Sequence, residues 1–237
     1  MIPKVFNIGP IMISLLSIFY AFAFFLSSFF IWKGLKEEYQ EEDILNFTVI
    51  LTLGSILGAR LFYILFTPRL LFNPLRWLAL RIEPGFSFFG ALVSFLLITF
   101  LWSGKKKWDF WLVFDNLSLP FFFVFSFLSF GLIITNGEEL FFYLFFLSVL
   151  FSILSIFLAK YYRRFIWYKS GKPGFVGCLS LGFFSMIFGL LEFFLKKGVY
   201  FEIIGILLFA FLFLVLFYKR SERSVKEDFK SIFIRKK

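Results

Sequence analysis

The chain alternates between long apolar runs and short polar stretches, and this pattern predicts its main structural elements. Runs of about 18 or more apolar residues are typical of helices that cross a membrane. The segment AFA at 21–23 resembles a signal-peptidase site, but the apolar run continues past it, so we expect a retained span rather than a cleaved signal. We predict an all-α, polytopic membrane protein with seven transmembrane helices, at residues 11–32, 44–67, 86–103, 110–134, 139–158, 174–195 and 199–218.

Composition agrees with a membrane protein and limits the chemistry of any site. Of the 237 residues, 60% are apolar and 25% aromatic, with 44 Phe, whereas soluble domains contain about 45–50% apolar residues. The chain has one cysteine and no histidine, which excludes an internal disulfide, an imidazole base and a histidine metal site. We expect Cys178 to be a small core residue, and we expect no cofactor and no metal ion.

Basic residues are distributed unevenly between the two sides that the seven spans define. Of the 25 lysines and arginines, 18 fall in the loops after the first, third and fifth spans and in the tail, whereas 6 fall on the other side. Cytoplasmic loops carry the excess of Lys and Arg, so we expect the N-terminus outside and the C-terminus in the cytoplasm. We expect residues 1–218 to form the transmembrane domain and residues 219–237 a basic cytoplasmic tail, which contacts anionic membrane lipids rather than nucleic acid.

Two local patterns predict how a span packs and how the loop after it is arranged. Gly54 and Gly58 lie four residues apart in the second span, a spacing that lets two helices approach closely. In the following loop, Asn73 can cap a short interfacial helix. The arginines of that helix, Arg76 and Arg81, would lie at the level of the lipid headgroups.

Several polar residues are expected in the outer half of the membrane, in segments that are otherwise apolar. Arg60 lies in the second span, roughly 10 Å below its outer end at the rise of an α-helix. Charged side chains within a membrane are costly and usually mark a functional site. A structural ion pair between Arg60 and Glu192 is the alternative interpretation. The residues expected near the outer face are Arg60, Ser87, Gly90, Asn136, Glu138, Glu139 and Glu192.

Four segments occur in an order that is similar to the pattern of a known family. They are FNIGP at 6–10, GARLFYILF at 58–66, PGFSFFGALV at 84–93, and NGE at 136–138, which begins sixteen residues after Pro120. Over about residues 5–197, the chain resembles the bacterial prolipoprotein diacylglyceryl transferases. The resemblance implies seven spans in the bacterial inner membrane with the N-terminus outside. It also implies transfer of a diacylglyceryl group from phosphatidylglycerol to the lipobox cysteine of a prolipoprotein.

The chain departs from the family pattern at positions that carry charge or protons. It has Phe89 where the pattern has histidine, Phe130 where it has arginine and Ile133 where it has asparagine. Glu192 stands at about the place of a late arginine, and the external segment that follows the NGE turn in the family is nearly absent. A transferase with this sequence would therefore need other groups for its chemistry.

The implied reaction defines what those groups must do. Transfer to a thiol needs cations that hold the glycerophosphate leaving group and a base that helps to form the thiolate. An arginine can bind phosphate oxygens with two parallel hydrogen bonds, so we expect Arg60 at the headgroup phosphate. Further candidate cations are Arg76, Arg81, Lys196 and Lys197. The resemblance and the shared membrane face give Glu138 and Glu192 as candidate catalytic bases, and Arg60, Ser87, Gly90, Asn136 and Gly137 as candidate substrate-binding residues.

Three functional hypotheses remain open at the level of the sequence. The first is a divergent diacylglyceryl transferase, whose partners are phosphatidylglycerol, prolipoprotein signal segments and membrane lipids. The second is a non-catalytic homologue that binds lipids or lipoproteins, because the chain lacks the family histidine. The third is a small-solute transporter, although the sequence has neither the internal repeats nor the broken helices typical of that class.

Overall fold

Seven long helices form the fold in the computed structural model, which describes residues 5–8, 11–72, 77, 85–165, 168, 170–195 and 200–222. Each of these helices is long and apolar enough to cross a membrane, which confirms the prediction of an all-α, seven-helix membrane protein. The long helices of the described chain are α1 (Leu15–Leu35), α2 (Glu41–Phe66), α4 (Phe88–Lys106), α5 (Phe110–Asn136), α6 (Glu139–Tyr161), α7 (Phe175–Leu195) and α8 (Tyr200–Arg220).

Shorter elements precede α1 and join some of the long helices. The strands β1 (Val5–Ile8) and β2 (Ile11–Ser14) pair antiparallel, so the prediction that the first helix begins at residue 11 is wrong. Ser14 ends the strand and caps α1, because its hydroxyl accepts a hydrogen bond from the Ser17 N–H at 3.1 Å. Two more short elements are the helix α3 (Pro68–Leu71) and the 3₁₀ helix η2 (Tyr162–Arg164).

Two predictions from the sequence fall largely outside the described residues. The helix expected over 73–81 is one of them, since only Trp77 of that segment is described. The basic tail is the other, because the description ends at residue 222. Helix α8 itself continues to Arg220, so the predicted domain boundary at 218 lies within the last turn of this helix.

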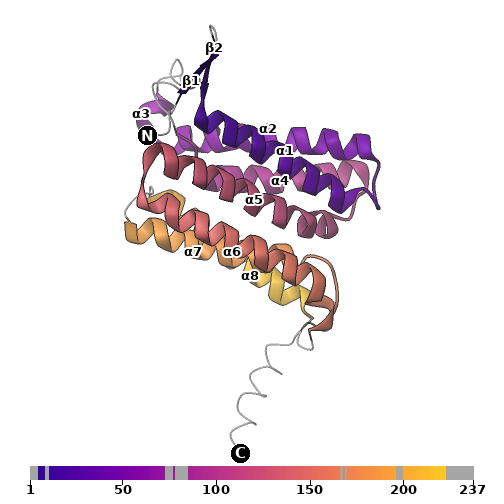
Figure 1. The fold of residues 1–237 in the computed structure, drawn as a ribbon. Coiled ribbons are helices and arrows are strands. Elements are labelled where there is room, and N and C mark those ends of the chain that lie inside the picture. Colours follow the sequence, from indigo (N-terminus) through magenta and orange to yellow (C-terminus); the bar gives the residue numbers. More distant parts are fainter. Residues whose placement is uncertain are drawn as a thin grey trace, which may run out of the picture.

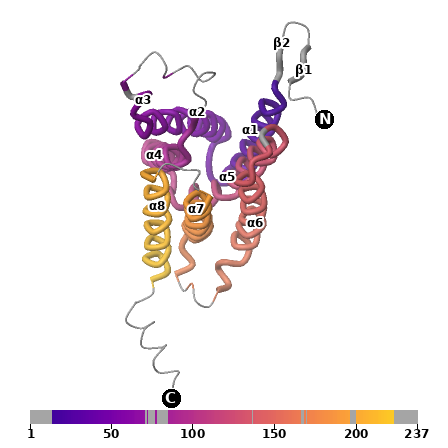
Figure 2. Tube along the Cα trace, turned by 90° about the vertical axis from the view of Figure 1, so that its left-hand side faces the viewer, coloured from indigo at the N-terminus to yellow at the C-terminus, as the bar shows by residue number. Residues whose placement is uncertain are grey.

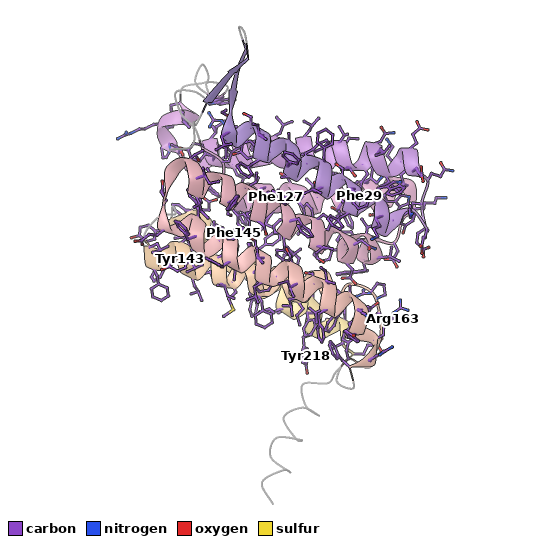
Figure 3. All side chains as sticks on the ribbon, in the orientation of Figure 1. Phe29, Phe127, Tyr143, Phe145, Arg163 and Tyr218 are labelled. Carbon is purple, nitrogen blue, oxygen red and sulfur yellow. The ribbon has the colours of Figure 1, made fainter. Side chains whose placement is uncertain are left out.

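The long helices alternate in direction, which gathers their ends into two groups (Figure 1). At one group α2, α5 and α7 finish, while α1, α4, α6 and α8 begin. We call this the Arg60 end, and the strands and α3 lie there as well (Figure 1). The opposite group, where α5 begins close to Asp115, is the Asp115 end. Figure 3 labels Tyr143 near the Arg60 end of α6 and Arg163 directly after its other end.

Helix α7 lies in the interior of the bundle. Figure 2 shows it between α8 and the pair formed by α5 and α6, and it packs against all three. Phe184 of α7 is fully buried, and its ring contacts those of Phe122 and Phe151, with centroids 5.1 and 5.7 Å away. Cys178 of the same helix has no exposed surface, which confirms its prediction as a core residue.

Large apolar side chains also cover the outside of the bundle. Phe29 of α1, which is labelled in Figure 3, is 49% exposed, and Leu57 of α2 and Phe146 of α6 are exposed as well. A soluble protein rarely exposes an apolar surface of this extent, whereas lipid chains can cover it without cost. The side-chain distribution therefore agrees with a bundle that spans a membrane.

Helices α2 and α4 approach closely because small residues line their contact. A Cβ atom at Gly58 would lie 1.7 Å from Ser94 Oγ, and one at Gly90 would lie 2.7 Å from the Gly58 carbonyl oxygen. One turn earlier, a Cβ at Gly54 would lie 2.2 Å from the side chain of Ile98. The spacing of the two α2 glycines marks a close helix contact, as predicted, and this contact fixes α2 against the first turns of α4.

Candidate functional site

Arg60 is buried near the end of α2 and holds the loop that follows this helix. Only 7% of the residue is exposed. Its Nε donates a hydrogen bond to the Trp77 carbonyl oxygen at 3.0 Å, and Nη1 donates to the Gly85 carbonyl oxygen at 2.9 Å. The guanidinium also lies 5.5 Å from the centre of the Tyr63 ring. Arg60 therefore ties the loop between α2 and α4 to the bundle.

Ser87 connects three helices at the start of α4. It has no exposed surface, and its N–H donates to the Ala59 carbonyl oxygen of α2 at 2.9 Å. Its hydroxyl oxygen accepts from the Gly90 N–H at 3.1 Å, which caps α4. The same hydroxyl donates to Oε1 of Glu202 in α8 at 2.7 Å. The contact brings the predicted residues Arg60, Ser87 and Gly90 together where α2 meets α4.

Glu202 belongs to this site and was not predicted from the sequence. In addition to the Ser87 hydroxyl, its Oε1 accepts from the Phe89 N–H at 3.4 Å. A carboxylate at this place faces the unpaired N–H groups and the positive dipole end of α4. Glu202 lies inside the last predicted span, so the search for intramembrane charge that selected Glu192 would also have found it.

Glu192 lies one turn from the end of α7 and keeps an unused hydrogen-bond acceptor. The residue is 9% exposed, and its buried Oε2 atom accepts no hydrogen bond from any described residue. Glu202 is the neighbouring charge that acts on it. The alternative of an ion pair between Arg60 and Glu192 is not realised between these two residues, both of which are described. Arg60 binds loop carbonyls instead.

Phe89 occupies an apolar space beside these carboxylates. Its ring contacts the rings of Phe62, Phe66 and Phe209, with centroids 5.6, 6.2 and 5.9 Å away. Gly205 of α8 leaves room for it, since a Cβ there would lie 2.9 Å from the Phe89 ring. At the position where the family pattern has histidine, this chain therefore places an aromatic ring that packs and offers no proton.

The α5–α6 turn lies at the same end of the bundle and carries the other predicted residues. Gly137 ends α5 with φ of +70°, and its N–H donates to the Ile133 carbonyl oxygen at 3.0 Å. Glu138 follows as the N-cap residue of α6 and is exposed. Asn136 is the last residue of α5, and its side chain is not among the described groups. Glu138 is thus a surface carboxylate, in contrast to Glu192.

A second polar cluster lies at the Asp115 end and was also missed. Asp115 of α5 accepts from the Gly174 N–H at 2.6 Å and from the Gly177 N–H at 2.8 Å, which caps α7. Arg220 donates to the Pro173 carbonyl oxygen at 2.7 Å and lies 4.2 Å from the centre of the Trp111 ring. These contacts join α5, α7 and α8, and they point to a structural role.

Tyr168, in the loop before α7, belongs to the same end of the bundle. Its hydroxyl donates to the Lys172 carbonyl oxygen at 2.7 Å, and the residue is almost completely buried. This burial raises the pKa of Tyr168 above its usual value. The phenol therefore stays protonated at neutral pH and serves as a fixed donor to the loop.

The two clusters differ in what they can do chemically. The Arg60 end combines one buried guanidinium, a hydroxyl and two carboxylates against aromatic rings, a set that can bind hydrogen-bond donors and anions at separate points. The described residues include no group of three or more acidic, cysteine or histidine side chains that could hold a metal ion.

Comparison with known proteins supplies an independent line of evidence. Residues 3–234 match the family model described as prolipoprotein diacylglyceryl transferase. Three similar relatives bear the name phosphatidylglycerol–prolipoprotein diacylglyceryl transferase. The relative from Rickettsia typhi is 33% identical over 117 residues, which are 46% of this chain and 43% of the relative. Those from Desulfotalea psychrophila and Campylobacter jejuni subsp. doylei are 31% and 32% identical over 118 and 119 residues, covering 48% and 44% of this chain. The matched part spans 43% and 42% of their lengths, so it covers less than half of each relative.

Proposed function

We propose a function from one premise, namely that this chain belongs to the prolipoprotein diacylglyceryl transferase family. The proposed activity is transfer of a diacylglyceryl group from phosphatidylglycerol to the lipobox cysteine of a prolipoprotein. The observation that carries the proposal is the family match over residues 3–234, nearly the whole chain. The polar cluster at the Arg60 end supports it, because that cluster lies where helices long enough to cross a membrane begin and end.

The proposed reaction exchanges one bond at the lipid for one bond at the thiol. The cysteine sulfur attacks the glyceryl carbon that bears the phosphate, a C–S bond forms, and the C–O bond to the phosphate breaks. Glycerol phosphate leaves with the bonding electrons, and the thiol proton passes to a base. The protein must therefore stabilise negative charge on the phosphate and supply a proton acceptor near the thiol.

Two carboxylates are proposed as bases, and the structure surrounds them differently. Glu138 is exposed at the α5–α6 turn, where a peptide thiol can reach it. Glu192 is buried and has an oxygen without a hydrogen-bond partner among the described residues. Replacement of either by glutamine keeps its shape and removes its ability to take a proton. The variant of the true base should lose at least about a hundredfold in rate.

Arg60 is proposed as the cation for the phosphate. The proposal rests on its charge and on its place near the end of α2, where its guanidinium is held by two carbonyl oxygens of the chain between α2 and α4. The candidate cations Arg76, Arg81, Lys196 and Lys197 lie outside the described residues. A guanidinium that is already held by the protein loses little freedom when it binds an anion, and this favours phosphate binding.

Orientation and location complete the proposal. The seven helices make a multi-pass membrane protein, and an odd number of spans puts the two chain ends on opposite sides. The uneven distribution of basic residues favours a cytoplasmic Asp115 end and an outer Arg60 end. The proposed site would then face the side on which prolipoproteins emerge, and we propose the bacterial inner membrane as its location.

One observation favours a second candidate, a homologue that binds lipid or lipoprotein without transfer. Phe89 packs entirely among aromatic rings where the family pattern has a group that can carry a proton. The two candidates are separated by one assay on the purified full chain in detergent. The chain is mixed with phosphatidylglycerol and a lipobox peptide, and the thioether-linked product is measured by mass spectrometry.

Product formation that depends on Glu138 or Glu192 would support the transferase. Lipid binding without product, in a preparation whose folding is verified by a cooperative thermal transition, would support the binding homologue. Failure of the folded protein to bind phosphatidylglycerol would contradict both.

A further inference from the structure

We propose that Glu192 and Glu202 bind the hydrogen-bond-donating end of a phospholipid headgroup. Either the hydroxyls of a glycerol headgroup or the ammonium of an ethanolamine headgroup has this chemistry. The inference deepens the proposed function and rests on its lipid site, because it says which part of the lipid each side of the site contacts. It begins from the free acceptor of Glu192.

The Oε2 atom of Glu192 is a buried acceptor with nothing to accept from in the described chain. Burial of a carboxylate oxygen without a donor costs free energy, and native structures rarely keep such a group without a reason. A donor from a bound molecule would remove this cost. The residue lies one turn from the end of α7, a helix long and apolar enough to cross a membrane.

Glu202 adds a second carboxylate and so limits the kind of ligand group that can bind beside Glu192. Its Oε1 is engaged by the Ser87 hydroxyl and by the Phe89 N–H, so its carboxylate is fixed at the start of α4. Gly189 of α7 faces Ile206 of α8, so Glu192, one turn further along α7, lies level with Glu202 on the antiparallel neighbour. Two neighbouring carboxylates repel the oxygens of a phosphate and attract hydroxyl or ammonium hydrogens.

The phosphate of the same lipid has a separate place on the other side of Ser87. The Ser87 N–H binds the carbonyl oxygen of Ala59, the residue directly before Arg60, while the Ser87 hydroxyl binds Glu202. Ser87 thus joins the residue before Arg60 on α2 to Glu202 on α8. This order, cation and then carboxylates, matches a headgroup with a phosphate followed by a donor group.

Aromatic rings of the bundle core lie next to these carboxylates along the helices. Phe88, next to Ser87, contacts Phe188 of α7 with ring centroids 4.5 Å apart, and Phe188 lies one turn before Glu192. Apolar rings below a polar group are suited to the glyceryl and acyl parts of a lipid. The polar and apolar parts of the site therefore follow the order of polar and apolar parts in a phospholipid.

The test compares lipids that share the phosphodiester and differ in the group attached to it: two neutral hydroxyls, an ammonium or a methyl. The full chain in detergent is titrated with phosphatidylglycerol, phosphatidylethanolamine or phosphatidylmethanol, which has the phosphodiester but no donor, and binding is measured by native mass spectrometry. We expect phosphatidylglycerol or phosphatidylethanolamine, whichever the site recognises, to bind about tenfold more tightly than phosphatidylmethanol. Hydrogen bonds to a charged group are worth about this much. Equal binding of all three lipids would overturn the inference.

Two variants of Glu192 identify the headgroup. Glu192→Leu should abolish the preference for the donor-bearing lipid. Glu192→Gln keeps a carbonyl acceptor, so it should retain part of a preference for glycerol and lose nearly all of a preference for ethanolamine. Glu139→Gln is the matched control, because Glu139 is exposed at the same end of the bundle, and it should keep the wild-type preference. A preference that survives Glu192→Leu would contradict the assignment.

The transfer assay keeps this inference apart from the proposed function. On this assignment Glu138 is the base, so Glu192→Leu should raise the KM for lipid more than it lowers kcat. A chain that shows the headgroup preference without transfer would contradict the proposed function and support the binding site. A chain that transfers without headgroup preference would support the proposed function and contradict the headgroup site.

Discussion

The two ends of the bundle use similar residues in opposite ways. At the Asp115 end, each carboxylate oxygen of Asp115 accepts a backbone N–H from the start of α7. At the Arg60 end, Glu202 plays a similar part at the start of α4, but Glu192 beside it has a buried oxygen that no described group satisfies. The cluster at the Asp115 end has its carboxylate oxygens hydrogen-bonded and stabilises the fold, while the cluster at the Arg60 end leaves one acceptor unsatisfied among the described residues.

The placement of opposite charges shows the same difference. At the Asp115 end cations lie next to anions, as in the ion pair of Lys106 with Asp43 at 2.6 Å. At the Arg60 end the guanidinium of Arg60 binds carbonyl oxygens while two carboxylates lie near each other. Neighbouring like charges cost stability, and such a cost is typical of sites that bind or react.

The comparison fails completely if the two ends face the wrong sides of the membrane. Reporter fusions after residues 107 and 237 should report the cytoplasm, and fusions after Leu75 and Glu138 should report the outer side. The expected signals are all-or-none, because a reporter is either translocated or not. Exchange of the two sets would contradict the orientation inferred from the basic residues.

Loss of the Asp115 carboxylate should have the largest effect on stability. Asp115→Ala removes two hydrogen bonds that cap α7 and leaves Arg220 without its neighbouring charge, so we expect a loss of about 2 kcal/mol in the free energy of unfolding. The measurement is denaturant unfolding in detergent. Asp109→Ala, which removes an exposed cap of α5, is the matched control and should cost about half as much. An Asp115→Ala variant as stable as wild type would show that these hydrogen bonds do not stabilise this end of the bundle.

Replacement of Arg60 should weaken lipid binding by about tenfold in the alanine variant and by less in the lysine variant. The reason is that lysine keeps the charge but cannot form two parallel hydrogen bonds to phosphate. Phosphatidylglycerol affinity per folded molecule is the measurement, because the alanine variant also loses two bonds to the loop. Trp77→Phe controls for loosening of that loop, since it removes only the indole bond to the Leu70 carbonyl oxygen. Unchanged affinity in Arg60→Ala would remove Arg60 from the lipid site.

Replacement of Glu192 should have the smallest effect on stability, with no loss comparable to that of Asp115→Ala. Glu192→Leu removes a buried carboxylate oxygen that has no partner among the described residues, so we expect the free energy of unfolding to stay within about 1 kcal/mol of wild type or to rise. The same denaturant series measures it. A loss as large as that of Asp115→Ala would show that Glu192 stabilises the fold and is not an acceptor available to a ligand.

The sequence predicted the helices, and it predicted that Arg60, Ser87 and Gly90 lie at the same end of the bundle. Apolar length alone located all seven spans, and the spacing of Gly54 and Gly58 identified a close helix contact. The first helix was placed too early, because apolar residues of β2 read the same as those of a span. In a chain rich in apolar residues, hydropathy separates membrane from water but does not separate strand from helix.

The partners of the polar residues could not be predicted. Ser87 and Glu202 are 115 positions apart, and Asp115 and Gly174 are 59 apart, so no local pattern joins them. Glu202 could have been selected as an intramembrane charge, but its role as a cap of α4 needs the fold. Arg60 was correctly placed within a membrane-spanning helix, whereas its burial and its bonds to the loop carbonyls depend on where that loop returns.

The contact of α2 with α4 also limits how this sequence can change over time. With 44 phenylalanines in 237 residues, the chain accepts aromatic rings at many positions, both inside and on its surface. At Gly58 and Gly90 even a methyl group would collide with the facing helix. A substitution there either requires both helix backbones to shift apart or disrupts the packing of α2 against α4. Substitutions toward phenylalanine and other large residues can therefore accumulate over most of the bundle. They are not accepted at these few positions, so the Arg60 end keeps its geometry.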